Sequence, residues 1–244
     1  MDFTNSDQWH LESRAHIVAE AADSNALNSG HFHHLFNVRR LAVGEKVTIC
    51  DGMGTVRLAE VVPTTSREPG SRKGRRDLGL SLAGIGSAKF FDPPEFNIEM
   101  VLAMIDFTKL EVALAKLTEL GVSAITLVET RRSVSVAGGS RRVSSERVMR
   151  VLREAGGQCR SVYLPKVTFQ SLEDVMERVT VCDRGARRME TRPRALLIGP
   201  EGGFERGEIP DEFPRVSLPG HVLRAETAAV AAAAIALSFA PTSK

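Results

Sequence analysis

Cysteine is scarce in this sequence, and so are the larger aromatic residues. The 244 residues include three cysteines, one tryptophan and one tyrosine. Cys50, Cys159 and Cys182 are far apart, and none belongs to a C-x-x-C pair. This spacing argues against a disulfide framework or a structural zinc site, so a reducing cytoplasm is the expected location. With so few aromatic rings, extensive stacking on single-stranded nucleic acid is not expected either.

Long apolar runs and a basic leader are also missing. The first residues, MDFTNSDQWHLES, are acidic and polar and lack the features of a signal peptide. No uncharged apolar run reaches the length that spans a membrane, and the alanine-rich run 225–240 contains Glu226. We expect that run to form a buried helix in a protein that does not contact a membrane.

A strong excess of charge of one sign is absent from the whole chain but present locally. The net charge is +2, whereas residues 129–160 carry eight arginines against three glutamates. Residues 61–77 carry five basic and two acidic side chains, and residues 1–25 carry one arginine and five acids. The basic segments suit contacts with phosphates of folded RNA. A solvated face or a set of ion pairs is the alternative for any single arginine.

The first part of the chain has the pattern of a small β-rich domain. Short alternating strands are separated by turns rich in glycine, which is typical of a barrel or sandwich. These strands are Val47–Cys50, Val56–Val62 and Leu78–Ile85. The paired prolines Pro93 and Pro94 then mark a boundary. We expect a first domain over residues 1–88 and a second over residues 95–244.

The second part alternates between strands and helices. The expected strands are Asn97–Ile105, Val122–Val128, Ser161–Val167, Ala195–Ile198 and Arg215–Leu218. The expected helices are Thr108–Leu120, one from Ser144 to Ala155 or beyond, Leu172–Val179 and Glu226–Phe239. Such alternation predicts an α/β domain with a mostly parallel sheet covered on both faces.

One expected strand runs directly into a loop rich in glycine, in the stretch LIGPEGGF from Leu197 to Phe204. Ligands of α/β sheets bind beyond the carboxyl ends of strands, and glycines let the backbone approach them closely. The pattern matches neither common phosphate-binding motif, and Glu201 would repel a phosphate. It suits a neutral or cationic ligand with hydroxyl groups and ring nitrogens. A plain tight turn is the alternative.

A second loop of the same design follows the next strand, in the stretch LPGHVLRAETA from Leu218 to Ala228. Glu226 and Thr227 fall in the first turn of the expected helix, where a carboxylate and a hydroxyl suit the exposed N–H groups. We therefore expect them to cap that helix. Two such loops could together enclose one ligand.

The combination of LIGPEGGF and VLRAETA resembles the bacterial 16S rRNA uridine-N3 methyltransferase family, in the SPOUT class. Supporting segments cover nearly the whole chain: His33–Glu45, Lys116–Val122, Arg131–Val134 and Glu154–Arg160. The resemblance implies a PUA-like β-barrel that binds RNA, followed by an α/β SPOUT domain with a C-terminal deep trefoil knot. It also implies a homodimer that holds S-adenosylmethionine at the subunit interface.

The resemblance assigns roles to individual residues. It implies that the cofactor is bound by Ile198, Gly199, Pro200, Glu201, Gly202, Gly203, Leu218, Gly220, Leu223, Arg224, Glu226, Thr227 and Ala228. Arg224 is the candidate that stabilises the uridine anion, and Glu201 or Glu226 could accept the proton. RNA contacts are expected from Arg39, Arg40, Arg72, Lys73, Arg131, Arg132, Arg141, Arg142, Gln158 and Arg160.

The second loop departs from the family pattern L-G-x-R-I-L-R. Pro219 stands where the family has glycine, and His221 stands where it has arginine. This leaves open a non-catalytic RNA-binding module of ribosome assembly. The resemblance to the SPOUT class, which acts on several RNAs, also leaves open the same chemistry on another RNA such as tRNA. The cluster of His31, His33 and His34 could ligate a metal, but no cysteine or acid lies nearby in the sequence, and we expect no metal.

Overall fold

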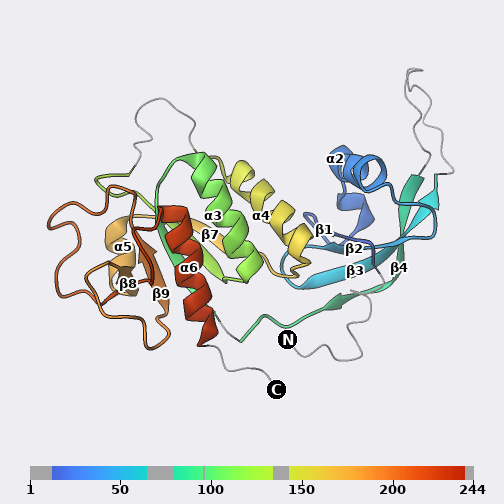
Figure 1. The fold of residues 1–244 in the computed structure, drawn as a ribbon. Helices are drawn as coiled ribbons and strands as arrows, with labels where there is room; N and C mark the ends of the chain where they lie inside the picture. Colours follow the sequence, from blue (N-terminus) through green and yellow to red (C-terminus); the bar gives the residue numbers. More distant parts are fainter. Residues whose placement is uncertain (1–12, 65–79, 96, 134–142, 240–244) are drawn as a thin grey trace. The chain divides into compact units, whose positions relative to one another are not determined.

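The computed structural model describes residues 13–64, 80–95, 97–133 and 143–239. The chain divides into two compact units (Figure 1). The first unit comprises Met1–Pro93 together with Gly156–Tyr163, and the second comprises Pro94–Ala155 together with Leu164–Lys244. The short segment Gly156–Tyr163 therefore packs with a part of the chain that lies far away in the sequence.

The first unit is built on a four-stranded sheet with the order β1-β2-β3-β4. Its strands are β1 (Ala15–Val18), β2 (Lys46–Cys50), β3 (Thr55–Pro63) and β4 (Leu80–Phe90). The pairs β2–β3 and β3–β4 are antiparallel, whereas β1 is parallel to β2. The sequence did not indicate β1. Closure of this sheet into a barrel stays a prediction.

Short helical segments connect β1 to β2. They are a 3-10 helix (Ser24–Ala26), the helix α2 (Ser29–His33) and a π-helical turn (His34–Val38). The histidines predicted as a conceivable metal cluster serve local structure here, since His31 and Asn28 form a capping box and His33 bonds Asn37. Within the described residues, no group of three or more potential ligands is arranged for a metal ion.

The segment Gly156–Tyr163 belongs to the first unit through specific hydrogen bonds. The His16 ring is buried. Its Nδ1 lies 2.7 Å from Thr48 Oγ1, and its Nε2 lies 3.1 Å from the Ser161 carbonyl oxygen. Gly54 N donates to the Val162 carbonyl at 3.0 Å. Because these bonds hold residues 161 and 162, the strand expected over Ser161–Val167 begins only at Lys166.

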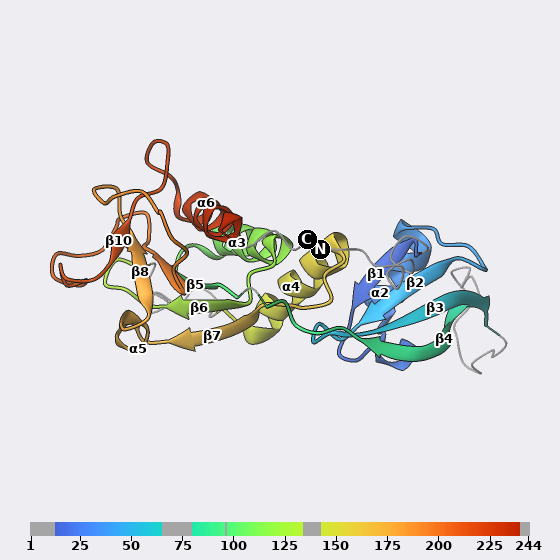
Figure 2. The same ribbon diagram turned by 90° about the horizontal axis from the view of Figure 1, so that it is seen from below.

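The second unit contains a six-stranded sheet with the order β10-β8-β9-β5-β6-β7 (Figure 2). The strands are β5 (Glu99–Ala103), β6 (Ala124–Val128), β7 (Lys166–Gln170), β8 (Val179–Cys182), β9 (Ala195–Ile198) and β10 (Arg215–Val216). Every pairing among them is parallel, as predicted. The helix predicted over Leu172–Val179 is wrong at its end, because Val179 already belongs to β8.

Helices lie on both faces of this sheet. They are α3 (Phe107–Leu120), α4 (Ser145–Cys159), α5 (Leu172–Met176) and α6 (Ala225–Ser238). Alternate residues of each strand point to opposite faces. Met100 and Leu102 of β5 pack with α3, α4 and α6, whereas Val101 packs with α5. Gly121 ends α3 in the left-handed conformation, with φ of 78°.

The alanine-rich run forms the buried helix α6, as predicted. Ala229, Ala232, Ala233 and Ala236 are fully enclosed. Small side chains let α6 approach α3 closely, and the two helices lie side by side in Figures 1 and 2. Among the described residues, we find no helix with the length and apolar character needed to cross a membrane.

An ion pair at the amino end of the sheet stabilises the second unit. Arg178 donates to both Glu99 oxygens, each at 2.9 Å, and Thr126 Oγ1 donates to Glu99 Oε1 at 2.6 Å. The hydrogen bond from Arg178, more than that from Thr126, lowers the pKa of Glu99 although partial burial opposes the shift. This bidentate geometry is stronger than that of an ordinary surface pair.

We expect Glu99→Gln to lower the free energy of unfolding by about 1–2 kcal/mol at neutral pH. Folding lowers the pKa of Glu99, so its contribution to the stability of the wild type is complete above the ordinary pKa of 4.5. That contribution is lost as pH falls through the lower pKa of the folded state. The free energy of unfolding, measured with urea between pH 3 and pH 7, should therefore depend less on pH in the variant than in the wild type.

The matched control is Glu119→Gln. Glu119 pairs with Lys116 in an exposed i,i+3 contact, which contributes little to stability. Equal losses of stability in both variants, or an unchanged pH slope for Glu99→Gln, would contradict the role given to the pair with Arg178.

Candidate functional site

The two loops rich in glycine leave the same edge of the parallel sheet. One follows β9 and the other follows β10, which lies two places away with β8 between them. The segments after β5 and β6 leave from this edge as well, because all of these strands are parallel. Such an edge is where α/β sheets bind ligands.

The first loop is a tight turn with three different uses for its glycines. Gly203 N donates to the Pro200 carbonyl at 2.8 Å, and Gly203 has the left-handed φ of 66°. A Cβ on Gly199 would lie 2.9 Å from the ring of Phe204, so glycine is needed there for packing within the loop. At Gly202, an added Cβ would meet only the Arg132 side chain, at 3.6 Å. The packing of the fold would therefore tolerate a side chain at Gly202.

Lys109 anchors this loop to the first turn of α3. Its Nζ donates to Glu201 Oε1 at 2.5 Å. This hydrogen bond is the main cause of the lowered pKa of Glu201 and of the raised pKa of Lys109. Glu201 is therefore ionised and held in place. Lys109 belongs to none of the sequence motifs and was not predicted, although the pairing of β5 with β9 brings α3 next to this loop.

Two arginines predicted as RNA contacts also hold the first loop. Arg132 Nη1 donates to the Gly202 carbonyl at 2.9 Å. Arg131 lies 3.6 Å from Glu205, and its backbone N donates to Glu208. Both arginines follow β6, which is separated from β9 by β5, so the loop is held by side chains from two strands away. The structure thus gives Arg131 and Arg132 a positioning role, and a role toward RNA stays a prediction.

The second loop leads into α6 without a capping side chain. Gly220 has a φ of 100°, which glycine adopts readily. Arg224 occupies the N-cap position, and its side chain makes no capping hydrogen bond. Glu226 and Thr227 lie in the first turn of α6, as predicted, but the expected capping is wrong, because Arg224 holds the N-cap position. The first N–H groups of α6 are left available to a ligand.

Charged residues from both loops interact with Lys109. Glu201 and Glu226 raise the pKa of Lys109, and Arg224 lowers it. The two loops, separated by the residues 204–217, are thus both linked to α3, the first through Lys109 and the second through the packing of α6 on α3. Glu226 Oε2 is buried and accepts no hydrogen bond from the described residues. A buried oxygen of this kind costs free energy until a donor reaches it.

The remaining cofactor candidates lie beside these groups in the sequence. Ile198 is buried at the end of β9, and Leu218 and Ala228 pack against the main core. Ala228 N donates to the Arg224 carbonyl at 2.8 Å. Leu223 lies 4.0 Å from the position that a Cβ on Gly220 would take.

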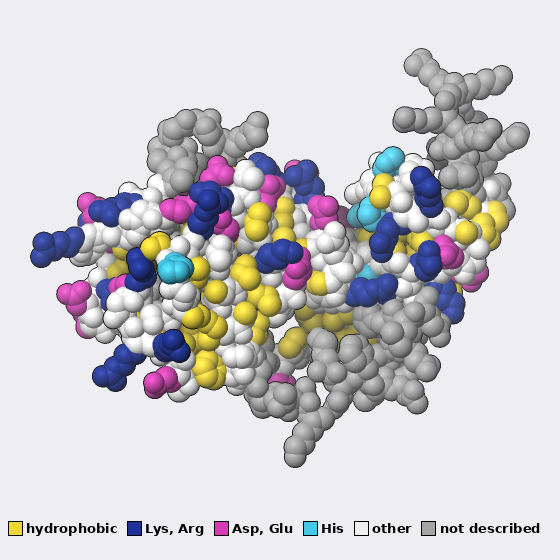
Figure 3. Space-filling view, in the orientation of Figure 1, with side chains coloured by type: hydrophobic (Ala, Val, Ile, Leu, Met, Phe, Trp, Pro, Cys, Tyr) yellow, Lys and Arg dark blue, Asp and Glu magenta, His cyan; other side chains and the backbone are white. Residues whose placement is uncertain are grey.

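The other predicted RNA contacts lie in the first unit or outside the described residues. Arg39, Arg40, Gln158 and Arg160 belong to the first unit. Arg40 and Arg160 have left-handed φ values, of 55° and 58°. Arg72, Lys73, Arg141 and Arg142 lie outside the described residues. Figure 3 shows several lysine and arginine side chains on the visible face of the first unit.

Comparison with known families gives a match for each part of the chain. Residues 92–237 match the RNA methyltransferase domain, and residues 27–68 match the RNA methyltransferase PUA domain. The first match alone covers more than half of the 244 residues.

Two relatives match most of the chain. One is ribosomal RNA small subunit methyltransferase E 2 of Borreliella burgdorferi, 25% identical over 223 residues, which are 82% of this chain and 84% of the relative. The other is ribosomal RNA small subunit methyltransferase E of Rickettsia conorii, 23% identical over 243 residues, covering 89% and 90%.

Solved structures share the fold. The ribosomal RNA small subunit methyltransferase E of Neisseria gonorrhoeae, bound to S-adenosylmethionine, superposes with a TM-score of 0.67 at 22% identity, over 85% of this chain and 89% of that one. A Legionella pneumophila protein in complex with the same cofactor also gives 0.67, at 23% identity, over 87% and 90%. At these identities the likeness shows a common fold.

Proposed function

The chain belongs to the RNA methyltransferase family, and from this premise we propose that it methylates N3 of a uridine in the 16S rRNA of the small ribosomal subunit. The methyl donor in this proposal is S-adenosylmethionine. The observation that carries the proposal is that both glycine-rich loops leave the same edge of the sheet beside α3, where Lys109 binds Glu201 and α6 packs against α3. Relatives named as small-subunit rRNA methyltransferases, and a cofactor-bound structure of the same fold, support it.

The residues present fit this cofactor. Backbone groups of Gly202 and Gly220 lie in loops with room for close approach, and Glu226 Oε2 lacks a donor. Lys109 compensates the charge of Glu201, whereas Glu226 favours a ligand that carries positive charge, as a sulfonium and an ammonium do. We propose that the backbone of 198–203 and 218–224 and the first turn of α6 hold it. When bound, S-adenosylmethionine supplies an electrophilic methyl group.

Arg224 has the properties needed to assist the uridine. It is exposed at the start of α6, and no hydrogen bond or ion pair with another described residue occupies its guanidinium group. A guanidinium beside O2 or O4 of the base would stabilise the negative charge that develops when N3 loses its proton. The N–CH3 bond then forms as the S–CH3 bond breaks, and the N3 proton passes to solvent or to a carboxylate such as Glu226.

The assembly follows from the same family membership. We propose a cytoplasmic homodimer with a trefoil knot at the carboxyl end of the chain. The path of the chain supports the knot, because β10 lies beyond β8 at the sheet edge and α6 then returns over β9 and β5. Exposed apolar side chains over α3 and α6, including Val112, support dimerisation (Figure 3). Light scattering that gives the mass of a monomer would contradict it.

The decisive experiment is methyl transfer from labelled S-adenosylmethionine to small ribosomal subunits and, separately, to tRNA. Mass spectrometry of the nucleosides should find N3-methyluridine in the 16S rRNA. If methyl is transferred to tRNA alone, the proposed reaction stands but its substrate is tRNA instead of 16S rRNA. Failure to bind the cofactor, measured by calorimetry, would favour a non-catalytic RNA-binding module, which is the alternative that Pro219 and His221 leave open.

A further inference from the structure

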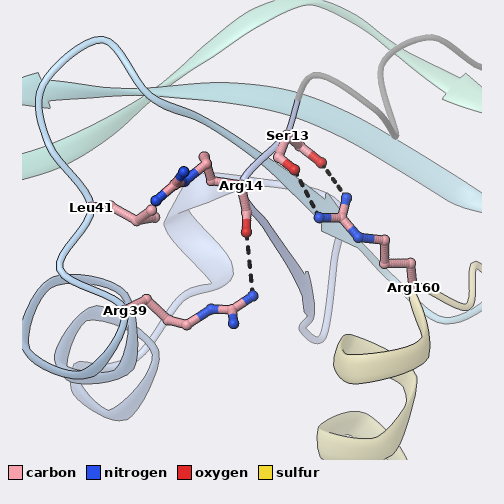
Figure 4. A pocket seen from close by; sticks show the side chains of 5 residues that line it. All are labelled: Ser13, Arg14, Arg39, Leu41 and Arg160. Carbon is pink, nitrogen blue, oxygen red and sulfur yellow. Dashed lines mark hydrogen bonds between the residues drawn. The ribbon is translucent and has the colours of Figure 1, made fainter.

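A hollow lined by three arginines lies within the first unit. Its volume is about 310 Å³, and it is lined by Ser13, Arg14, Arg39, Leu41 and Arg160 (Figure 4). Ser13 and Leu41 are buried, whereas Arg14 and Arg39 are exposed. The three arginines come from separate places, before β1, after the π-helical turn and after α4. No acidic side chain is among these lining residues, so the fold gathers positive charge here.

Hydrogen bonds to uncharged oxygens orient two of these arginines. Arg160 donates through Nη1 to Ser13 Oγ at 2.7 Å and through Nη2 to the Ser13 carbonyl at 2.8 Å. Arg39 Nη2 donates to the Arg14 carbonyl at 3.3 Å, and both sets of bonds are drawn in Figure 4. A carbonyl fixes the direction of the Arg39 guanidinium but does not compensate its charge. Most N–H donors of Arg39 thus remain open to an anion.

Arg14 adds a third guanidinium group with unused donors. Its Nε lies 3.2 Å from Glu45 Oε1, in a pair whose side chains are 67% and 29% exposed. An exposed pair of this kind contributes little to stability. Glu45 thus contacts Arg14 through Nε, and within the described residues the Nη groups of Arg14 make no hydrogen bond of their own.

We propose that this hollow binds a phosphate group of the RNA backbone. Arg14 and Arg39 contact the phosphate oxygens, and Arg160 positions the wall through its bonds to Ser13. Planar guanidinium forks match the geometry of phosphate oxygens and bind them bidentately. The matched PUA domain spans Arg39 and Leu41, which favours RNA over a free anion. This inference rests on the proposed function, since it takes the same RNA as substrate.

The test is the affinity of Arg39→Gln and Arg14→Gln for 16S rRNA at several salt concentrations. Each variant should bind about tenfold more weakly at low salt. The slope of log affinity against log salt should become shallower by about 0.7–0.9, because each substitution removes one cation that neutralises a phosphate. Affinity for S-adenosylmethionine should stay unchanged, because neither arginine belongs to the loops of the second unit.

Lys89→Gln is the control, because it removes one positive charge from exposed surface of the same unit outside the hollow. An unchanged salt slope in both arginine variants, or the same weakening in Lys89→Gln, would overturn the phosphate site. If the phosphate site is overturned in this way but the wild-type protein still methylates 16S rRNA, the proposed function remains. Arg160→Lys, which keeps the charge but removes the two-point bond to Ser13, should weaken binding without changing the slope. A wild-type protein that neither binds nor methylates this RNA would instead remove the proposed function.

Discussion

Arg224→Ala is expected to lower kcat by about 100- to 1,000-fold, while the affinity for S-adenosylmethionine changes far less. The reason is the position of the guanidinium group, exposed at the N-cap of α6 and without a partner among the described residues. A group that stabilises charge only as N3 loses its proton contributes to the transition state rather than to cofactor binding. Single-turnover methyl transfer at saturating RNA, with calorimetry for the cofactor, measures the two effects separately.

The matched control is Arg194→Ala. Arg194 is also exposed, but it lies directly before β9, at the opposite edge of the sheet from the loops. Its variant should keep wild-type kcat. Equal reductions in kcat and in cofactor affinity for Arg224→Ala would make this arginine a binding residue, and a normal kcat would remove it from the mechanism.

The regular elements of the second unit could be predicted because each carries its own signal. The strand Ala195–Ile198 is a continuous apolar run, and α3 shows helical spacing that ends at Gly121. The strand β8 has only four residues and follows a helix of five residues, so periodicity could not separate them. The first strand, β1, is as long as β9, but it was missed because His16 interrupts its apolar run.

The candidate site was predictable only in part. A motif lies within one stretch of sequence, whereas the site combines residues from several distant segments. Both glycine-rich loops were recognised, and the family match confirms the resemblance drawn from them. Lys109 joins the site through the pairing of β5 with β9, and Arg132 through the position of β6. The membership of Gly156–Tyr163 in the first unit depends likewise on long-range hydrogen bonds to His16 and Gly54.

Gly202→Val is expected to weaken S-adenosylmethionine binding by at least about 100-fold, a change of roughly 2.7 kcal/mol, and to leave the fold intact. An added Cβ would lie 3.6 Å from Arg132 Cδ, which is ordinary contact with a flexible side chain. The backbone of Gly202 is not left-handed, so valine causes no strain there. What valine does remove is the open approach to the loop backbone that a ligand needs.

Calorimetric titration of the cofactor and thermal unfolding of the same samples distinguish a damaged site from a damaged fold. Gly185→Val is the control, because Gly185 also lies in an exposed turn without a left-handed φ, and a Cβ there meets nothing within 4 Å. Both variants should unfold at the wild-type temperature, and only Gly202→Val should fail to bind the cofactor. Wild-type affinity in Gly202→Val would place the cofactor elsewhere than against this loop, and Lys109 would then hold Glu201 for the stability of the turn alone.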